Sequence, residues 1–362
     1  MKTMTKTINV GNIKIGGGNR ISVQSMTNTD TANYEKTLKQ ICELEKAGCD
    51  IVRLAVGNDA DIESCKKLIS AVSVPLVADI QFDYRIAIKC AEIGFSKIRI
   101  NPGNIGSPER VKAVVDACKT AGVPIRVGVN SGSLDKDIYS KYGNTPKALV
   151  ESAMKHVRLL ENFNFYDIVV SVKASSVPLC VQAYRLLSQS TDYPLHIGIT
   201  ESGGGESALL KSAIGIGSLL LDGIGDTVRV SLSDSPVEEV YAAKKILRAA
   251  GIDKNYCEIV SCPTCSRCKY DLIGIVREMQ DYVKDIRIPM KIAVMGCVVN
   301  GPGEAKDCDF GVAGGGERAV LFEKGEIIKT IPTNNVIPEL KRKKRKLNAK
   351  RFFKKIQRTY RR

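Results

Sequence analysis

The sequence lacks three features that would each assign it to a broad class of protein. No apolar run among its 362 residues approaches the roughly 20 residues of a membrane-spanning helix. The N-terminus has no apolar segment like that of a secretory signal peptide. The glycine-rich stretches carry neither a Gly-Lys-Ser/Thr nor a GxGxxG fingerprint. We therefore expect a cytoplasmic protein of a reducing compartment, without a P-loop or a dinucleotide-binding turn.

The 12 cysteines do not predict a disulfide framework, because a chain of this length can bury a large core without cross-links. Cys262, Cys265 and Cys268 form a C-x2-C-x2-C run, and Cys297 follows the apolar stretch 292–295. A zinc ribbon needs a second CxxC pair, which the sequence does not contain outside this run. The spacing favours an iron–sulfur cluster, with structural zinc or inert thiols as the alternatives.

Charge is concentrated at one end of the chain. The formal net charge is +15, yet residues 341–362 hold 13 Lys or Arg and no acid, so the other 340 residues carry only +2. We interpret this basic tail as a solvated helical extension that is dispensable for chemistry. The alternative is a surface that binds RNA or another anion.

One pattern recurs through residues 21–233: an apolar strand, a loop, and a helix with apolar residues spaced by three and four. Several helices end in glycine, as at Gly48, Gly94 and Gly122. The alternation predicts an α/β fold, a (β/α)8 TIM barrel, with a doubly wound open sheet as the alternative. The strands are expected at residues 21–26, 50–56, 75–80, 97–101, 124–130, 167–174, 194–200 and 227–233.

Three segments are expected along the chain. The barrel occupies residues 1–253 and begins with a short hairpin over residues 7–15. Residues 254–340 predict a small α+β domain that carries the metal centre, with a helix near 270–284 and strands near 290–296, 318–322 and 327–331. The basic tail follows at residues 341–362.

Polar residues recur at a spacing of two within the expected barrel strands, which places each set on one strand face. Because the carboxyl ends of barrel strands meet at one mouth, five cations are expected to converge there. Together they predict a site for a polyanion such as a diphosphate, whereas each arginine alone could have a structural partner in Asp79, Glu201, Asp222 or Asp226. The five cations are Arg53, Arg99, Arg126, Lys173 and Arg229.

Five strings identify a family. They are SVQSMTNT at residues 22–29, RINPGN at 99–104, HIGITE at 196–201, CPTC at 262–265 and GCVVNGPGE at 296–304. In this order, across residues 7–332, the chain resembles the 4-hydroxy-3-methylbut-2-enyl diphosphate synthases of isoprenoid biosynthesis. The resemblance implies a TIM barrel followed by a [4Fe-4S] domain. It also implies a reductive ring opening of 2-C-methyl-D-erythritol 2,4-cyclodiphosphate with loss of water.

The resemblance further implies partners and site residues. Electrons would come from a flavodoxin or a ferredoxin, and in a homodimer one chain's cluster domain would cover its partner's barrel. Glu201 is a candidate proton donor, and Asp79, Asn130, His196 and Asn300 would lie around the reacting carbons. The cluster ligands would be Cys262, Cys265, Cys297 and Glu304, and the five cations would hold the diphosphate with Ser231.

Two positions depart from the family pattern. Gln81 stands where the family usually has histidine, and an amide can form hydrogen bonds but cannot titrate. Cys268 is an additional thiol beside the expected cluster, where it could compete with Glu304.

Overall fold

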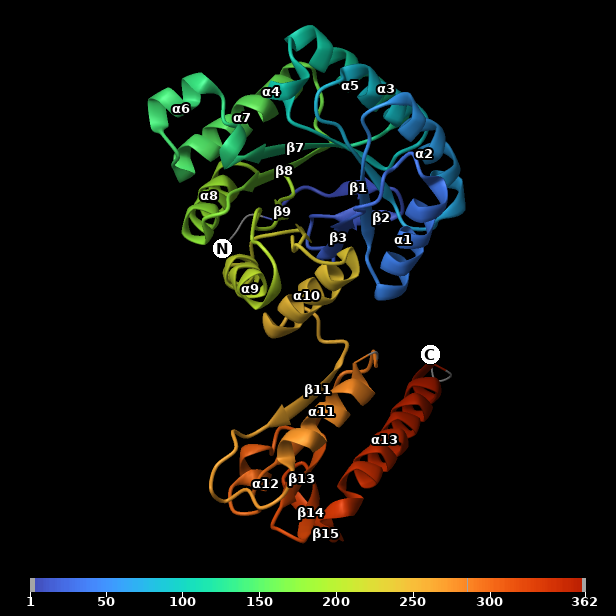
Figure 1. Ribbon diagram of the computed structural model, residues 1–362, viewed down its shortest axis with the longest axis vertical. Helices are drawn as coiled ribbons and strands as arrows, with labels where there is room; N and C mark the ends of the chain where they lie inside the picture. The colour runs from blue at the N-terminus through green and yellow to red at the C-terminus, as the bar shows by residue number, and fades with distance from the viewer. Residues whose placement is uncertain (1–3, 285, 360–362) are drawn as a thin grey trace. The chain divides into compact units, whose positions relative to one another are not determined.

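The computed structural model describes residues 4–284 and 286–359 (Figure 1). The chain divides into two compact units, Met1–Ile252 and Asp253–Arg362, here called the barrel unit and the C-terminal unit. Within the described residues, no helix has the length and apolar character required to cross a membrane.

The barrel unit is a closed (β/α)8 barrel. Its sheet has the order β8-β7-β6-β5-β4-β3-β10-β9, with parallel pairing throughout. The two ends of this order meet where Val170 pairs with Leu195. This closure confirms the predicted TIM barrel over the open sheet. The strands are β3 (Ser22–Met26), β4 (Ile51–Ala55), β5 (Leu76–Asp79), β6 (Lys97–Ile100), β7 (Ile125–Asn130), β8 (Ile168–Lys173), β9 (His196–Ile197) and β10 (Thr227–Val228).

Helices surround the strands (Figure 1). Gly48 and Gly122 end two of them in the left-handed region, with φ of 79° and 66°, as the sequence predicts. Two short helices that the sequence did not predict interrupt the loops after β6 and β7, namely α4 (Pro102–Ile105) and α6 (Lys136–Tyr142). The main helices are α1 (Tyr34–Ala47), α2 (Asp59–Ala71), α3 (Tyr84–Glu92), α5 (Pro108–Ala121), α7 (Pro146–Asn162), α8 (Val177–Ser190), α9 (Gly205–Leu221) and α10 (Pro236–Ala249).

The strands face two environments, because their side chains alternate between the helices and the barrel interior. On β4, Val52 and Leu54 belong to the core beneath the helices, whereas Ile51 packs in a different cluster inside the barrel. Arg53 lies between Val52 and Leu54 and therefore shares the interior face with Ile51. The same alternation places the other polar strand residues in the interior.

A hairpin closes the end of the barrel where the strands begin. It consists of β1 (Ile8–Val10) and β2 (Ile13–Ile15), at the predicted position. Ile8, Val10 and Ile15 pack against Ile51, Val77 and Val169, which lie near the starts of their strands. The apolar plug formed by these six residues separates the polar interior from solvent at that end.

The C-terminal unit is a five-stranded sheet in the order β11-β12-β13-β14-β15. The pairs among β11, β12 and β13 are parallel, and the remaining pairs are antiparallel. The predicted α+β character is confirmed, although the sequence reading missed β11 and β13. The strands are β11 (Cys257–Ser261), β12 (Met290–Met295), β13 (Phe310–Gly314), β14 (Arg318–Glu323) and β15 (Glu326–Pro332), with helices α11 (Leu272–Val283) and α12 (Gly301–Glu304).

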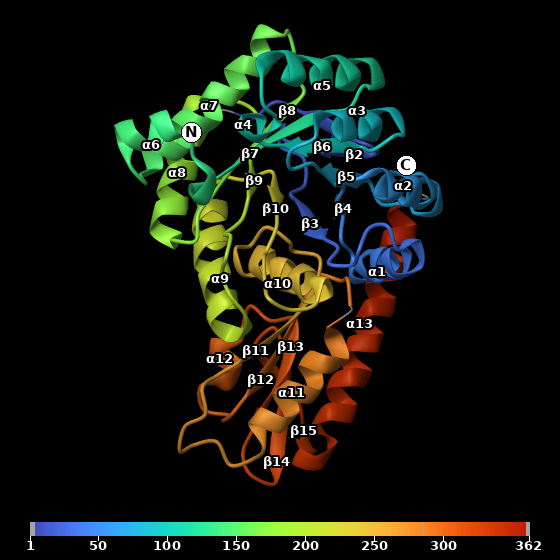
Figure 2. The same cartoon turned by 45° about the horizontal axis from the view of Figure 1, so that its top comes forward.

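The helix α13 (Val336–Thr359) begins before the basic tail and continues through most of it. Val336 and Leu340 are fully buried in the core of the C-terminal unit, and α13 lies beside α11 (Figure 2). Lys341 pairs with Glu278 of α11 at 2.8 Å, and Lys343 pairs with Glu323 of β14 at 2.6 Å. The first turns of the basic segment are therefore packed and ion-paired. The bulk of its remainder, from residue 350 on, has side chains outside the described set.

Candidate functional site

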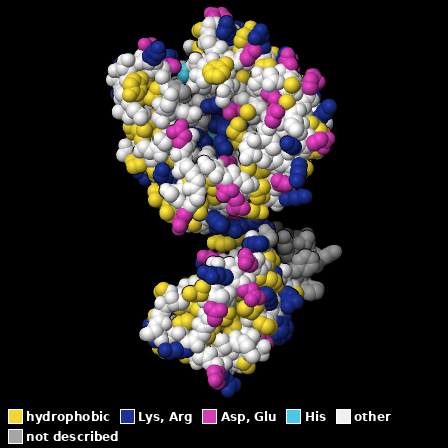
Figure 3. Space-filling model, viewed as in Figure 1, with side chains coloured by type: hydrophobic (Ala, Val, Ile, Leu, Met, Phe, Trp, Pro, Cys, Tyr) yellow, Lys and Arg dark blue, Asp and Glu magenta, His cyan; other side chains and the backbone are white. Residues whose placement is uncertain are grey.

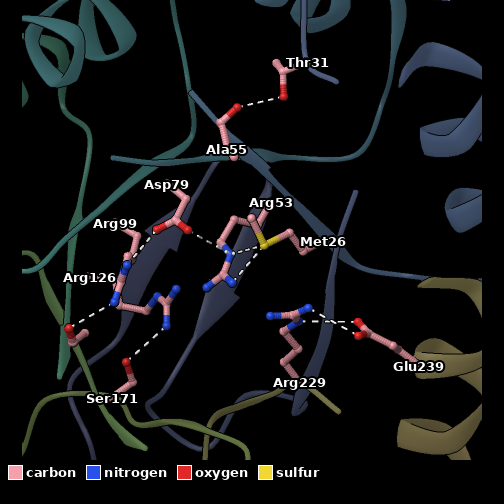
Figure 4. Close-up of polar contacts among 11 residues, drawn as sticks. Met26, Thr31, Arg53, Ala55, Asp79, Arg99, Arg126, Ser171, Arg229 and Glu239 are labelled. Atoms are coloured by element: carbon pink, nitrogen blue, oxygen red, sulfur yellow. Dashed lines mark hydrogen bonds and ion pairs between the residues drawn. The ribbon is translucent and has the colours of Figure 1, made fainter. Parts of the chain in front are cut away.

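Asp79 ends β5 at the centre of the predicted cation set (Figure 4). Its Oδ1 lies 3.0 Å from Arg99 Nη1, and its Oδ2 lies 3.9 Å from Arg53 Nε. Burial alone would raise the pKa of this carboxyl group, but the charges of Arg53, Arg99 and Arg126 outweigh burial and lower it. Asp79 is therefore a carboxylate that holds two arginines in place.

Arg126 is the most deeply buried of the five cations, with 1% of its surface exposed. It is paired in register with Arg99 on the neighbouring strand. Its Nη1 donates to Ser171 Oγ at 3.1 Å, whereas Nε and Nη2 have no partner within the described chain. A buried charge with unmet donors is costly, so this guanidinium is prepared for an anionic ligand.

Arg229 has a partner that the sequence reading did not propose. Its Nη2 lies 3.2 Å from Oε1 of Glu239, in the first turn of α10. Glu239 also accepts hydrogen bonds from Ser25 Oγ at 2.9 Å and from the Leu232 amide at 3.2 Å. Two of the acids proposed from sequence are engaged elsewhere, since Asp222 pairs with Arg185, and Asp226 accepts from Thr5 Oγ1 and the Leu195 amide.

The remaining two cations are Arg53 and Lys173, and Arg53 has a weak acceptor in addition to its distant pairing with Asp79. Arg53 donates from Nε and Nη2 to the sulfur of Met26, at 3.1 and 2.9 Å, and a thioether is only a weak acceptor. Burial lowers the pKa of the Arg53 guanidinium to about 10, so Arg53 stays charged near neutral pH. Lys173, 6% exposed, is surrounded by positive charge, and burial followed by the charges of Arg229 and Arg126 lowers its pKa.

Two glycines make room for these cations, a role that the sequence reading missed. A Cβ at position 128 would lie 2.6 Å from Arg99 Nε. A Cβ at position 198 would lie 3.0 Å from Lys173 Nζ and 2.4 Å from the carbonyl oxygen of Arg229. The signal was present, because both glycines lie two residues from a polar residue on the same strand face.

The interior thus has a surplus of positive charge. The five cations face two buried acids, Asp79 and Glu239, and Figure 3 shows Lys and Arg side chains inside a hollow of the barrel unit. Beside this hollow, a cleft of about 460 Å³ is lined by the loops after β3, β4 and β5. Its lining includes Asp30, Asp61, Asp83 and Gln81. The three carboxylates disfavour an anion in this cleft.

The other predicted barrel residues lie at or beyond the carboxyl ends of strands, except for His196. Asn130 ends β7, Ser231 follows β10, and both are half-buried. Glu201 is exposed after β9 and has a positive φ of 53°. His196 is fully buried, with Nδ1 2.7 Å from Thr227 Oγ1 and burial lowering its pKa well below the usual value.

Two predicted cluster ligands are adjacent to parallel strands of the C-terminal unit. Ser261 of β11 pairs with Val294 of β12, so the chain segments that follow the two strands begin side by side. Cys262 comes directly after β11, and Gly296-Cys297 comes directly after β12. The Gly296 amide donates to Cys262 Sγ at 3.1 Å. The parallel pairing of β11 and β12 therefore brings Cys262 and Cys297, which are far apart in sequence, to the same end of the sheet.

Cys265 is exposed in the loop between them, and hydrogen bonds from Arg267 lower its pKa. The charges of Cys297 and Glu304 also act on Arg267. Cys268 donates to the Tyr270 carbonyl at 3.4 Å. A Cβ on Gly296 would lie 3.2 Å from Cys268 Sγ and 3.3 Å from Cys262 Sγ, so both thiols flank this glycine.

Two family models together match most of the chain. The GcpE TIM-barrel domain matches residues 5–244, and the GcpE protein C-terminal domain matches residues 258–346. A 4-hydroxy-3-methylbut-2-en-1-yl diphosphate synthase (flavodoxin) from Caldanaerobacter subterraneus subsp. tengcongensis is 56% identical over 94% of this chain and 96% of its own. The protein of that name from Clostridium perfringens is 54% identical over 93% of this chain and 97% of its own. The chain belongs to the GcpE family.

Membership of the GcpE family confirms the resemblance seen in the five sequence strings and the two-part architecture of barrel and C-terminal domain. Neither the family models nor the relatives support the RNA-binding alternative. The relatives' names state that their electron donor is flavodoxin.

The thiols of this GcpE chain suit an iron–sulfur cluster by their chemistry. The described cysteines are all free, and Cys262 accepts a backbone N–H, a bond that tunes cluster thiolates. Among residues 4–284 and 286–359, no three His, Cys, Asp or Glu side chains are close enough to hold a metal ion. The four predicted ligands thus lie in the segments that follow β11 and β12, but they do not form a complete metal site.

Proposed function

We propose that this GcpE chain catalyses the two-electron reductive ring opening of 2-C-methyl-D-erythritol 2,4-cyclodiphosphate to 4-hydroxy-3-methylbut-2-enyl diphosphate. The observation that carries the proposal is the set of five cations in the barrel interior, where the described residues place two buried acids, Asp79 and Glu239, beside them. Relatives that match nearly the whole chain are named after this product.

The cations bind the diphosphate. Arg126 supplies two unpartnered donors, and Arg53 can exchange a weak sulfur acceptor for a phosphate oxygen. Arg99 is fixed by Asp79 and by the Gly128 carbonyl at 3.1 Å, so its position is set before substrate arrives. Such preorganised charge stabilises the negative charge that develops as the C–O bond to phosphate breaks. Lys173, Arg229 and Ser231 complete the diphosphate site.

A [4Fe-4S] cluster in the C-terminal unit would be held by Cys262, Cys265, Cys297 and Glu304, and when bound it would supply the electrons for the reduction. A carboxylate is more readily exchanged at iron than a thiolate, so Glu304 would be the exchangeable ligand, comparable to the open position of catalytic zinc sites. Asn300, which precedes α12, lies four residues before Glu304 and orients the substrate.

Proton delivery falls to Glu201. Its exposed carboxyl group lies in the loop after β9, at the end of the barrel where the cations gather. Asp79 cannot serve as the acid, because its arginine neighbours keep it ionised. His196 is kept neutral by burial and is held by Thr227, so it contributes a fixed hydrogen bond together with Asn130. Glu201 therefore protonates the leaving hydroxyl group.

The proposal includes a reducing cytoplasmic location, a flavodoxin donor with ferredoxin as the alternative, and a homodimer. In the dimer, the C-terminal unit of one chain covers the barrel of its partner. The family resemblance is the basis for this arrangement.

Anaerobic purification and iron analysis test the redox part of the proposal. The protein should be brown, with broad absorbance at the blue end of the visible spectrum and about four iron atoms per chain. A colourless protein that contains zinc and no iron, although folded, would contradict it.

A further inference from the structure

Lys97 is a buried lysine that the proposed reaction does not use. It lies on β6, two residues before Arg99, and therefore on the same interior face of the strand. None of its surface is exposed. Its register partner on β5 is Val77, a member of the apolar plug. Lys97 thus occupies the floor of the cation set, farther from the mouth than Arg99.

No acid compensates Lys97. Its Nζ has no hydrogen-bond partner within the described residues. The charges that act on it are those of Arg126 on β7 and Arg53 on β4, and its own charge acts on His196 of β9. The acid on the adjacent strand, Asp79, is already engaged by Arg99 and Arg53.

An ammonium group in this place would be unstable. Burial, followed by the repulsion of Arg126 and Arg53, lowers the pKa of Lys97 well below the usual lysine value. As a neutral amine, Lys97 offers a lone pair that can accept a hydrogen bond. Other groups in the interior lack partners too, namely Arg126 Nε and Nη2, both amide atoms of Gln24, and His196 Nε2. The interior around Lys97 is therefore polar and closed, and no acid among the described residues acts on this lysine.

We propose that Lys97 takes up a proton when a diphosphate occupies the cation set above it. The amine is uncharged in the anion-free barrel, and the bound anion supplies the negative charge that lets it become an ammonium. The proton comes from solvent, and no other bond changes. This inference rests on the proposed diphosphate site and adds a residue that responds to its occupancy.

The response suits the proposed reaction. Opening the cyclodiphosphate turns one diester phosphate into a terminal phosphate, which has a further ionisable oxygen with a pKa of about 6. Negative charge on the bound ligand therefore increases during turnover. A protonated Lys97 offsets that increase inside a closed site, where unbalanced charge is costly.

Calorimetry on the full-length, cluster-loaded protein tests the inference, with inorganic pyrophosphate as the probe. The number of protons taken up follows from the dependence of the binding heat on the ionisation enthalpy of the buffer. Wild-type protein should take up as much as about one proton more than Lys97→Met. Lys112→Met removes an exposed lysine paired with Asp116 and should match wild type. Because all variants bind the same probe, protons of pyrophosphate itself cancel.

Failure of the inference and failure of the diphosphate site give different results. Equal proton counts in wild type and Lys97→Met, with pyrophosphate bound by both, would overturn the inference; a lysine permanently charged beside a trapped anion would give this result. Failure of wild-type protein to bind pyrophosphate would instead overturn the diphosphate site itself. If Lys97→Met does not fold, Lys97→Gln takes its place. The affinity of wild-type protein for sulfate gives a second test, because sulfate does not titrate near neutral pH. A sulfate affinity that is unchanged from pH 6 to 9 would exclude proton uptake and overturn the inference.

Discussion

At the scale of the residue, the barrel interior is notable for buried polar groups that have no hydrogen-bond partner among the described residues. Arg126 and Lys97 keep unpartnered donors, although buried polar groups in proteins are nearly always paired. Glycines at positions 128 and 198 hold space open for cations instead of filling it. Unpartnered buried groups and unfilled space lower the stability of the folded protein, and we interpret them as the preparation of a binding site.

Stability should therefore respond to the charge of Lys97. Below its unfolded-state pKa, the unfolded chain binds a proton that the folded chain does not, because the folded-state pKa is lowered. Wild-type stability is thus lost as the pH falls from about 10 towards the folded-state pKa. Lys97→Met should be more stable than wild type at pH 7, and the difference should shrink at pH 10. Urea denaturation at both pH values measures it, and a difference independent of pH would contradict a neutral buried lysine.

The cysteine variants should fall into two groups, according to whether the thiol that is removed binds the cluster. Cys262→Ser, Cys265→Ser and Cys297→Ser are expected to lose the cluster, whereas Cys268→Ser should keep both iron and turnover. Glu304→Ala should retain some iron and lose most turnover, since its carboxylate is the proposed exchangeable ligand. Iron counts after anaerobic reconstitution decide between the sets. Because Cys268 and Cys262 flank the same glycine, loss of iron from Cys268→Ser would transfer the fourth position from Glu304 to Cys268.

Sequence patterns predicted which polar residues share the barrel interior better than they predicted how those residues pair. A spacing of two within apolar strands was enough to predict that Arg99, Arg126 and Lys173 share the interior. It could not reveal that Glu239, on a helix ten residues after Arg229, is the partner of that arginine. The spacing also did not reveal that Lys97 is buried. A lysine at the start of a strand is usually exposed to solvent, and only the structure shows that the apolar plug closes this end of the barrel.

At the scale of the element, both units place candidate functional residues at the carboxyl ends of parallel strands or directly after them. In the barrel these are Asp79, Asn130 and Lys173 at the ends of β5, β7 and β8, and in the C-terminal unit they are Cys262 and Cys297 after β11 and β12. Strands with long apolar runs were predictable. β13 was missed because its sequence, FGVAG, is rich in glycine and is recognised as a strand only through its partners.

The element α13 sets a limit on truncation. Ending the chain after Ala349 should leave unfolding and iron content unchanged, because the packed turns of the helix remain. Ending it after Glu339 removes Leu340, which is fully buried, and should cost about 2–5 kcal/mol in the stability of the C-terminal unit. Thermal unfolding of both truncated proteins tests this. The expectation that the tail is dispensable for chemistry stays a prediction, although the first turns of the tail are packed. Equal stability of the two truncated proteins would contradict that packing.

At the scale of the whole molecule, the two units divide the proposed chemistry, since one binds the diphosphate and the other carries the cluster. A dimer that exchanges these units between chains can be tested by complementation. Arg126→Ala weakens the diphosphate site of the barrel and Cys297→Ser removes the cluster, so each homodimer should have little activity at a substrate concentration near the wild-type KM. Coexpressed, they should form mixed dimers with one intact pair of sites and restore about a quarter of wild-type activity. Absence of restoration in confirmed mixed dimers would mean that each chain uses its own cluster.

The central claim is tested most directly by anaerobic turnover of 2-C-methyl-D-erythritol 2,4-cyclodiphosphate with a chemical reductant. Wild-type protein should release 4-hydroxy-3-methylbut-2-enyl diphosphate. Arg126→Ala should bind substrate more weakly by about 2–4 kcal/mol, the cost of removing one partner from a desolvated charge pair. Arg85→Ala, which removes an exposed arginine paired with Asp83, should match wild type. Iron-loaded, folded protein that forms no product, or an Arg126→Ala variant with wild-type KM, would contradict the account.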